Sequence, residues 1–160
     1  MKLRPMTAIY LTHGDDILLL YRMGSRVVGD SYTGSAGGHM EPEEITSPEA
    51  CVLRELREET GLTEADIRDL TLRYVTLRCK NGEIRENFYY FAEIKDAEQT
   101  VVSNEGRLEW HSIHALQGLP MPHTARQVLE HYLAVGRKTE LLYGAVSEEE
   151  GTIFTPLQDF

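Results

Sequence analysis

A strongly acidic segment, residues 41–66, holds nine Asp or Glu residues and only two basic ones. Within it, Ser47-Pro48-Glu49 combines a capping hydroxyl, a proline that fits the first helical turn and a carboxylate suited to a helix N-terminus. Thr60-Gly61 then provides a stop signal, because glycine readily adopts the left-handed conformation that ends helices. The segment therefore predicts a helix over residues 48–60.

The predicted helix places three carboxylates on one face. At about 100° per residue, Glu55, Glu58 and Glu59 fall within one sector of the helix surface. The opposite face, which we expect to pack against the core, carries Ala50, Leu53, Leu56 and Thr60. Like charges at this spacing repel one another, and a hard divalent cation, which prefers oxygen ligands, would remove that repulsion. The pattern indicates a site for Mg²⁺ or Mn²⁺, while a solvated acidic helix face is the alternative that the helix alone leaves open.

The remainder of the chain predicts a mixture of strands and helices of the α/β (α+β) class. Apolar and β-branched runs bounded by turn signals predict a second helix over 124–135 and strands over 7–12, 17–22, 70–79, 84–94, 100–103, 108–111, 141–146 and 152–155. Residues 24–40 contain five glycines and no periodicity, which is typical of a long functional loop.

Composition narrows the class of protein. The 160 residues suit a single domain over residues 1–160, and the formal net charge of −10 argues against stable binding to a nucleic-acid polymer. Cys51 and Cys79 lie far apart and outside any CxxC motif, so neither a disulfide framework nor a structural zinc site is expected. No apolar run approaches the roughly 20 residues that span a membrane. We therefore expect a cytoplasmic protein without membrane attachment, for which small phosphorylated ligands bridged by a cation are possible.

The acidic segment and the glycines before it resemble the Nudix box, a glycine and a glutamate followed by R-E-U-x-E-E-x-G-U, in which U is apolar. The matching residues are Gly38, Glu44, Arg54-Glu55-Leu56, Glu58-Glu59 and Gly61-Leu62. Nine residues separate Glu44 from Arg54 where the family pattern has seven, so Ile45-Thr46 looks like an insertion before the helix, and no role is assigned to Glu44. Residues 104–110 resemble, more weakly, the segment that supplies a late carboxylate and a Trp-bearing strand in MutT-like members.

The resemblance implies a Nudix-type α/β/α sandwich with a mixed β-sheet, and a hydrolase that acts on a nucleoside diphosphate linked to another group. It implies Mg²⁺, or alternatively Mn²⁺, as the cofactor, held by Glu58, Glu59 and the carbonyl group of Gly37. Glu55 would be a further metal ligand or the base that activates water. Arg54 would hold Glu55 in place through a salt bridge.

Residues outside the box extend the expected site. The resemblance implies Glu105 as a metal ligand from a distant loop, and Glu109 competes with it for that role. Arg22 and Arg26 flank the glycine-rich stretch and are candidates for phosphate contacts, although loop arginines are commonly solvated. Trp110 is a candidate for stacking on the base of the substrate, with burial in the core as its alternative.

The intact Arg54, Glu55, Glu58 and Glu59 favour an enzyme over a non-catalytic nucleotide-binding regulatory module. The resemblance to MutT-like members favours a nucleoside triphosphate pyrophosphohydrolase that releases a nucleoside monophosphate and pyrophosphate, with oxidised purine nucleotides among its candidate substrates. An ADP-ribose or nucleotide-sugar pyrophosphatase is the alternative. The sequence does not predict the oligomeric state.

Overall fold

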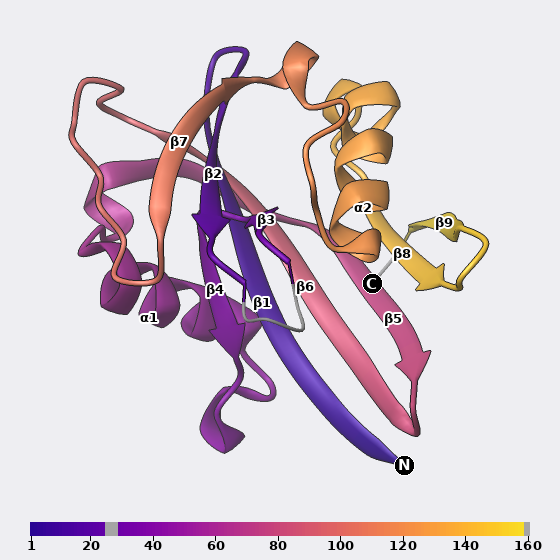
Figure 1. The fold of residues 1–160 in the computed structure, drawn as a ribbon. Coiled ribbons are helices and arrows are strands. Elements are labelled where there is room, and N and C mark those ends of the chain that lie inside the picture. Colours follow the sequence, from indigo (N-terminus) through magenta and orange to yellow (C-terminus); the bar gives the residue numbers. More distant parts are fainter. Residues whose placement is uncertain (25–28, 159–160) are drawn as a thin grey trace.

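A mixed β-sheet lies between two helices in the computed structural model, which describes residues 1–24 and 29–158 (Figure 1). The helices are α1, Pro48–Thr60, and α2, His123–Ala134. In the described part of the chain the strands are β1 Lys2–His13, β2 Asp16–Arg22, β3 Ser31–Thr33, β4 Ala36–His39, β5 Ile67–Lys80, β6 Glu83–Ile94, β7 Arg107–Ser112, β8 Leu142–Ser147 and β9 Thr152–Leu157. Short 3-10 turns occupy Pro42–Glu44, Glu64–Asp66, Ile113–Ala115 and Gly136–Lys138. Across these residues, no helix combines the length and the apolar character needed to cross a bilayer.

The sheet has the strand order β3-β2-β1-β6-β5-β8-β9, with β4 added to β1 and β7 added to β2. The pairs β1–β6 and β5–β8 are parallel, and the other pairs are antiparallel. β1 changes neighbours along its length, because residues 6–9 pair with β4 and residues 11–13 pair with β2. The buried Ser35 closes the point of divergence, where its hydroxyl donates to the Leu18 carbonyl at 2.6 Å and accepts from the Leu11 N–H at 3.0 Å.

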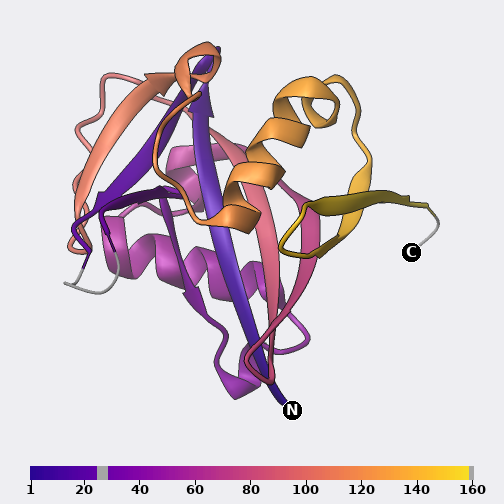
Figure 2. The same cartoon turned by 45° about the vertical axis from the view of Figure 1, so that its right-hand side comes forward.

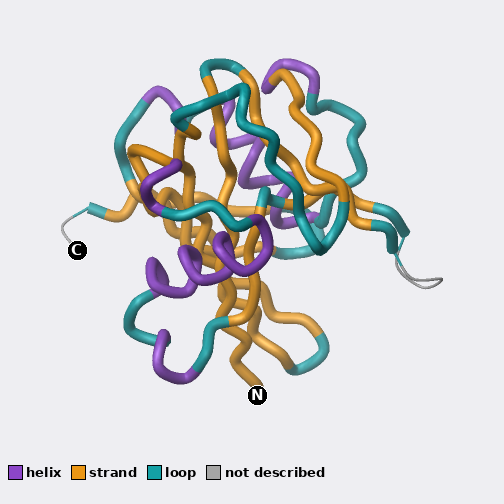
Figure 3. Tube along the Cα trace, turned by 90° about the vertical axis from the view of Figure 1, so that its left-hand side faces the viewer, coloured by secondary structure: helices purple, strands orange, loops and turns teal. Residues whose placement is uncertain are grey.

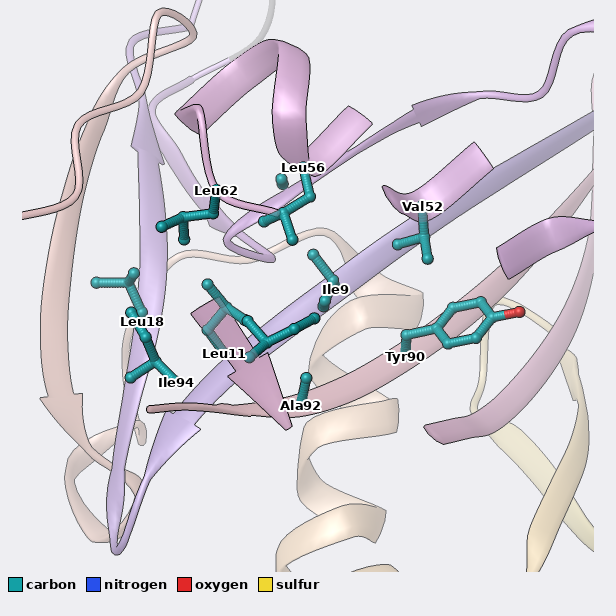
Figure 4. Close-up of a cluster of buried hydrophobic side chains, with 11 residues drawn as sticks. Ile9, Leu11, Leu18, Val52, Leu56, Leu62, Tyr90, Ala92 and Ile94 are labelled. Carbon is teal, nitrogen blue, oxygen red and sulfur yellow. The ribbon is translucent and has the colours of Figure 1, made fainter. Parts of the chain in front are cut away.

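Each helix covers one face of the sheet (Figure 2). On the α1 face, Val52 packs in a cluster with Ile9 of β1 (Figure 4). On the α2 face, Val128 packs in a cluster with Tyr10 of the same strand. Neighbouring β1 residues serve opposite faces because successive strand side chains point in alternate directions. The expected α/β/α sandwich with a mixed sheet is confirmed.

The predicted elements differ from the structure mainly where pairing depends on distant partners. α1 confirms the predicted range 48–60, and α2 lies one residue earlier than its predicted range. The prediction of one loop over 24–40 is wrong, because β3 and β4 lie within it and pair with β2 and β1. The predicted strand over 100–103 is also wrong, since these residues pair with no strand, and the residue after them, Asn104, donates to the Glu59 carbonyl of α1. β1 begins earlier than predicted because its parallel pairing with β6 starts at Lys2.

Candidate metal and active site

α1 packs on the sheet through the side that carries carboxylates. Its buried residues are Cys51, Val52, Leu56 and Glu59. The expected buried face is confirmed at Leu56 but is wrong in its centre, because Leu53 and Thr60 are only partly buried and Ala50 is exposed. The actual face is rotated toward Glu59, because the neighbouring strand β4 presents two glycines to the helix and leaves room for carboxylates between them.

Two glutamates of α1 lie against Gly37 and Gly38 of β4. The Gly37 N–H donates a hydrogen bond to Glu59 Oε2 at 3.3 Å. A Cβ atom at Gly38 would lie 2.5 Å from Glu55 Oε1, so the Glu55 carboxylate occupies the space that a side chain would need. A Cβ atom at Gly37 would collide with the Thr7 carbonyl oxygen of β1. The two glycines, which we call the glycine pair, therefore let both carboxylates approach one stretch of backbone.

Glu59 is a buried carboxylate, with only 9% of its surface exposed. Its pKa is raised to about 7, mainly by burial; the charges of Glu55 and Glu105 also raise it, whereas the Gly37 N–H and Arg22 lower it. A divalent cation here would offset both the burial and the repulsion between carboxylates. The chemistry of the Glu55 and Glu59 carboxylates therefore suits a hard metal ion, which they would hold on the side of α1 that faces the glycine pair.

Arg54 organises the outer side of the site through three glutamates. Its Nε and Nη2 donate to the two oxygens of Glu44 at 2.6 and 2.9 Å. Its Nη1 donates to Glu55 Oε1 at 2.9 Å and to Glu58 Oε2 at 3.0 Å. The guanidinium group holds the pKa of Glu44 at about 2. Glu44 therefore reaches Arg54 in spite of the insertion between them, and it forms the paired contact that fixes the guanidinium plane.

Glu58 is turned away from the glycine pair. Its side chain is 59% exposed, and its contact with Arg54 draws it to the outer side of the helix. Over residues 1–24 and 29–158, no group of three or more His, Cys, Asp or Glu side chains is close enough together to form a metal centre. The expectation of one compact cluster of Glu55, Glu58 and Glu59 is therefore not met in this arrangement of side chains.

The loop before β7 closes the site from the other end of the chain. The Asn104 N–H donates to the Glu59 carbonyl at 3.2 Å, and its Nδ2 donates to the Glu58 carbonyl at 3.1 Å. These contacts satisfy carbonyl groups that the helix C-terminus leaves free. They also place the next residue, Glu105, where its Oε2 accepts from Arg22 Nη2 at 3.1 Å. The structure thus brings together Glu105 and Arg22, two residues that the sequence singled out. Asn104, which positions this loop against α1, was not predicted from the sequence.

A cavity of about 140 Å³ opens beside Glu59, and Arg22 and Gly37 also line it. Aromatic and apolar side chains form most of its remaining wall, and they include Tyr10, Tyr89 and Ala125, together with the amide of Asn87. Trp110 of β7 does not line this cavity, and 38% of its surface is exposed. Arg26 lies outside the described residues. Sequence reasoning missed the cavity wall because its members come from strands and a helix that meet only in the fold.

Comparisons with known proteins agree with this geometry. A family model described as the NUDIX domain matches residues 2–132. The mutator MutT protein from Bacillus halodurans is a similar solved structure, with 24% identity, a TM-score of 0.64 and coverage of 97% of this chain and 95% of that chain. The MutT NUDIX hydrolase from Burkholderia pseudomallei has 26% identity, a TM-score of 0.62 and coverage of 81% and 98%. A C. elegans Ap4A hydrolase shares the fold at 17% identity, with a TM-score of 0.64 and coverage of 87% and 100%. No curated protein sequence matched the chain.

Because the family model spans most of the chain, the protein belongs to the Nudix family. It is a Nudix hydrolase of the MutT-like kind, with its box residues on α1 and the preceding strand β4.

Proposed function

We propose that the protein is an Mg²⁺-dependent hydrolase of nucleoside diphosphate-linked compounds, with Mn²⁺ as an alternative ion, and that its substrate is a nucleoside triphosphate cleaved to the monophosphate and pyrophosphate. One observation carries this proposal: the cavity reaches Glu59 beside the glycine pair. A nucleotide inside the cavity would therefore present its phosphates to Glu55 and Glu59. A small-molecule nucleotide, and not a nucleic-acid polymer, is the expected partner.

The contacts of each residue suggest its role. Arg54 binds Oε1 of Glu55, which leaves Oε2 to accept a proton from the attacking water. Glu59 and the carbonyl group of Gly37 would hold the metal ion, and Arg22 is the candidate for a phosphate contact. When bound, the ion neutralises the diphosphate and lowers the pKa of water. Because Glu55 is held between Arg54 and the glycine pair, the base is already oriented before the substrate arrives.

The cavity supports a nucleoside as the group that is recognised. Its largely apolar and aromatic wall suits a base, and Asn87 supplies both hydrogen-bond donors and an acceptor. The likeness to MutT proteins supports a triphosphate, including one with an oxidised purine. ADP-ribose, nucleotide sugars and the dinucleoside polyphosphate named for the worm structure are the competing substrates. Initial rates on this panel, with products separated by chromatography, would decide among them.

We also propose that the enzyme works in the cytoplasm. Cys51 and Cys79 are both free thiols, which suits a reducing compartment. The net charge of −10 is compatible with small nucleotides whose charge is balanced by a cation. Measuring activity in cell fractions would test this location.

Removal of the metal ion should abolish hydrolysis. We expect EDTA to reduce turnover to background and added Mg²⁺ or Mn²⁺ to restore it, because the diphosphate and the two carboxylates otherwise repel each other. A calcium salt added in excess over EDTA controls for effects of the chelator itself. Turnover that persists in EDTA would contradict the proposal, and nucleotide binding without any turnover would favour the regulatory module.

Gly38→Ala should lower turnover by about tenfold or more, with little change in Tm, because the new methyl group would displace the flexible end of Glu55. Gly151→Ala is the matched control, since a Cβ atom there meets no atom within 4 Å. Turnover and Tm should be measured for both variants. Full activity in Gly38→Ala would show that the position of Glu55 against this glycine is unimportant.

A further inference from the structure

Three arginines form a row across neighbouring strands, near the end of the sheet where β1 begins and the β5–β6 turn lies beside the N-terminus (Figures 1 and 3). Arg85 of β6 is the register partner of Arg4 of β1 on one side and of Arg78 of β5 on the other. Register partners point to the same face of a sheet, so the three side chains share one face. We call these three residues the arginine row.

Glu83 is the one acidic residue that pairs with the arginine row among the described residues. Glu83 pairs with two of its members, at 3.3 Å and 3.1 Å, whereas Arg78 forms no ion pair with any described residue. The next row outward joins Lys2, Glu83 and Lys80 on the same face and adds two more cations. Like charges placed directly opposite one another destabilise a sheet. This face therefore carries an electrostatic cost that an anionic ligand would relieve, in a chain whose net charge is −10.

Other charged groups nearby do not balance the arginine row. Arg4 Nη2 lies 2.6 Å from His39 Nε2, which is a second nitrogen and not a carboxylate. The acidic residues 148–150 lie in the turn between β8 and β9, and within the described ranges none of them forms an ion pair with the row.

The arginine row lies next to the cavity that reaches Glu59. Met6 and Asn87 line that cavity, and each lies two residues along its strand from a member of the row, on the same face. Glu59 meets the cavity beside Gly37, whose register partner Ala8 is four residues along β1 from the row. Four residues of strand span about 13 Å. A nucleoside together with the length of an arginine side chain covers this separation.

We propose that the arginine row binds a second phosphate group, carried on the ribose of a nucleotide whose diphosphate lies at Glu55 and Glu59. The inference rests on the proposed function and narrows its substrate class to nucleotides with a 2′- or 3′-phosphate in addition to the 5′-diphosphate. Guanidinium groups suit this ligand because they bind phosphate oxygens through paired, charge-assisted hydrogen bonds. Arg78 is the member most available to it.

Nucleotide binding measured by calorimetry tests the arginine row without requiring turnover. We expect adenosine 3′,5′- or 2′,5′-bisphosphate to bind about tenfold more tightly than AMP, with the same gain for the guanosine pair if the cavity takes guanine. Higher ionic strength should shrink the gain. Arg78→Gln and Arg85→Gln should each lower the ratio of the two affinities several-fold. Glu83→Gln should raise that ratio, because it releases two arginines of the row.

Arg68→Gln is the matched control, because Arg68 is an arginine of the same strand, β5, that lies outside the row and pairs with one glutamate, Glu93. It should leave the ratio unchanged. Equal affinity of the wild-type protein for monophosphate and bisphosphate, or a gain that survives in both row variants, would overturn the proposal.

The phosphate bound by the arginine row could be a terminal phosphate on the ribose or a phosphodiester that links two nucleotides. A dinucleotide with a 5′-phosphate distinguishes the two. A gain limited to the bisphosphates supports a terminal phosphate on a small nucleotide, and an equal gain for the dinucleotide supports the row as a site for phosphodiesters also. A protein that prefers bisphosphates but hydrolyses nothing would refute the proposed function alone. A hydrolase without this preference would refute the arginine row alone.

Discussion

Replacing Glu59 by glutamine should reduce turnover by about 100-fold or more and raise the Mg²⁺ concentration needed for half-maximal activity. Glu59 is buried and is oriented by the Gly37 N–H, so its carboxylate occupies a position that a solvent-facing glutamate cannot reach without moving the helix. Glutamine keeps the size of the side chain and removes one anionic oxygen donor, the kind of ligand that Mg²⁺ prefers. Initial rates across an Mg²⁺ titration measure both effects.

Glu58→Gln is the matched control for that change, because it lies on the same turn of α1 but points outward to Arg54 with 59% of its side chain exposed. We expect a smaller rise in the Mg²⁺ requirement from Glu58→Gln than from Glu59→Gln. Glu55→Gln should instead act mainly on kcat, because it removes the proposed base. Identical kinetic changes in all three variants would contradict these separate roles, and Tm values would show whether any loss comes from unfolding.

The ends of α1 could be predicted because local chemistry sets them. Gly61 at the end of α1 has φ 77°, and its N–H donates to the Arg57 carbonyl, as a glycine stop signal requires. The box from Arg54 to Leu62 could be recognised for the same reason, since its charged residues share one helix and Gly61-Leu62 follow directly at the end of that helix. The hairpin around Asn81-Gly82 was equally local.

The orientation of α1 could not be predicted from its own residues. Helical spacing shows that Glu55 and Glu59 share a side, but the choice of the buried side depends on β4, which lies in a stretch without strand periodicity. Asn104 binds the Glu58 carbonyl across 46 positions of the chain, and nothing near it in the sequence marks this contact. The cavity wall and the place of Trp110 also depend on such distant contacts.

Replacing Arg54 by lysine should lower kcat by about 100-fold and reduce the free energy of unfolding by about 2 kcal/mol. The ammonium group of lysine cannot reproduce the paired contact with Glu44 and reach Glu55 and Glu58 together, so the proposed base would lose its orientation. We expect a smaller loss of stability than for a fully buried ion pair, because 24% of the Arg54 side chain and 12% of the Glu44 side chain are exposed to solvent. Turnover and urea unfolding of the two proteins measure the two effects.

The pH dependence of unfolding separates the structural part of this network from its catalytic part. Arg54 lowers the pKa of Glu44 from its ordinary value of 4.5 to about 2, so the pair stabilises the fold fully above pH 4.5 and loses its contribution as the pH falls toward 2. The stability gap between wild type and Arg54→Lys should therefore be constant near neutral pH and narrow below pH 4.5. Glu44→Gln should remove the same acid-dependent stability but lower kcat less than Arg54→Lys, because Arg54 would still hold Glu55 at 2.9 Å. A gap that widens on acidification would show that Glu44 does not stabilise the fold through its ionised form.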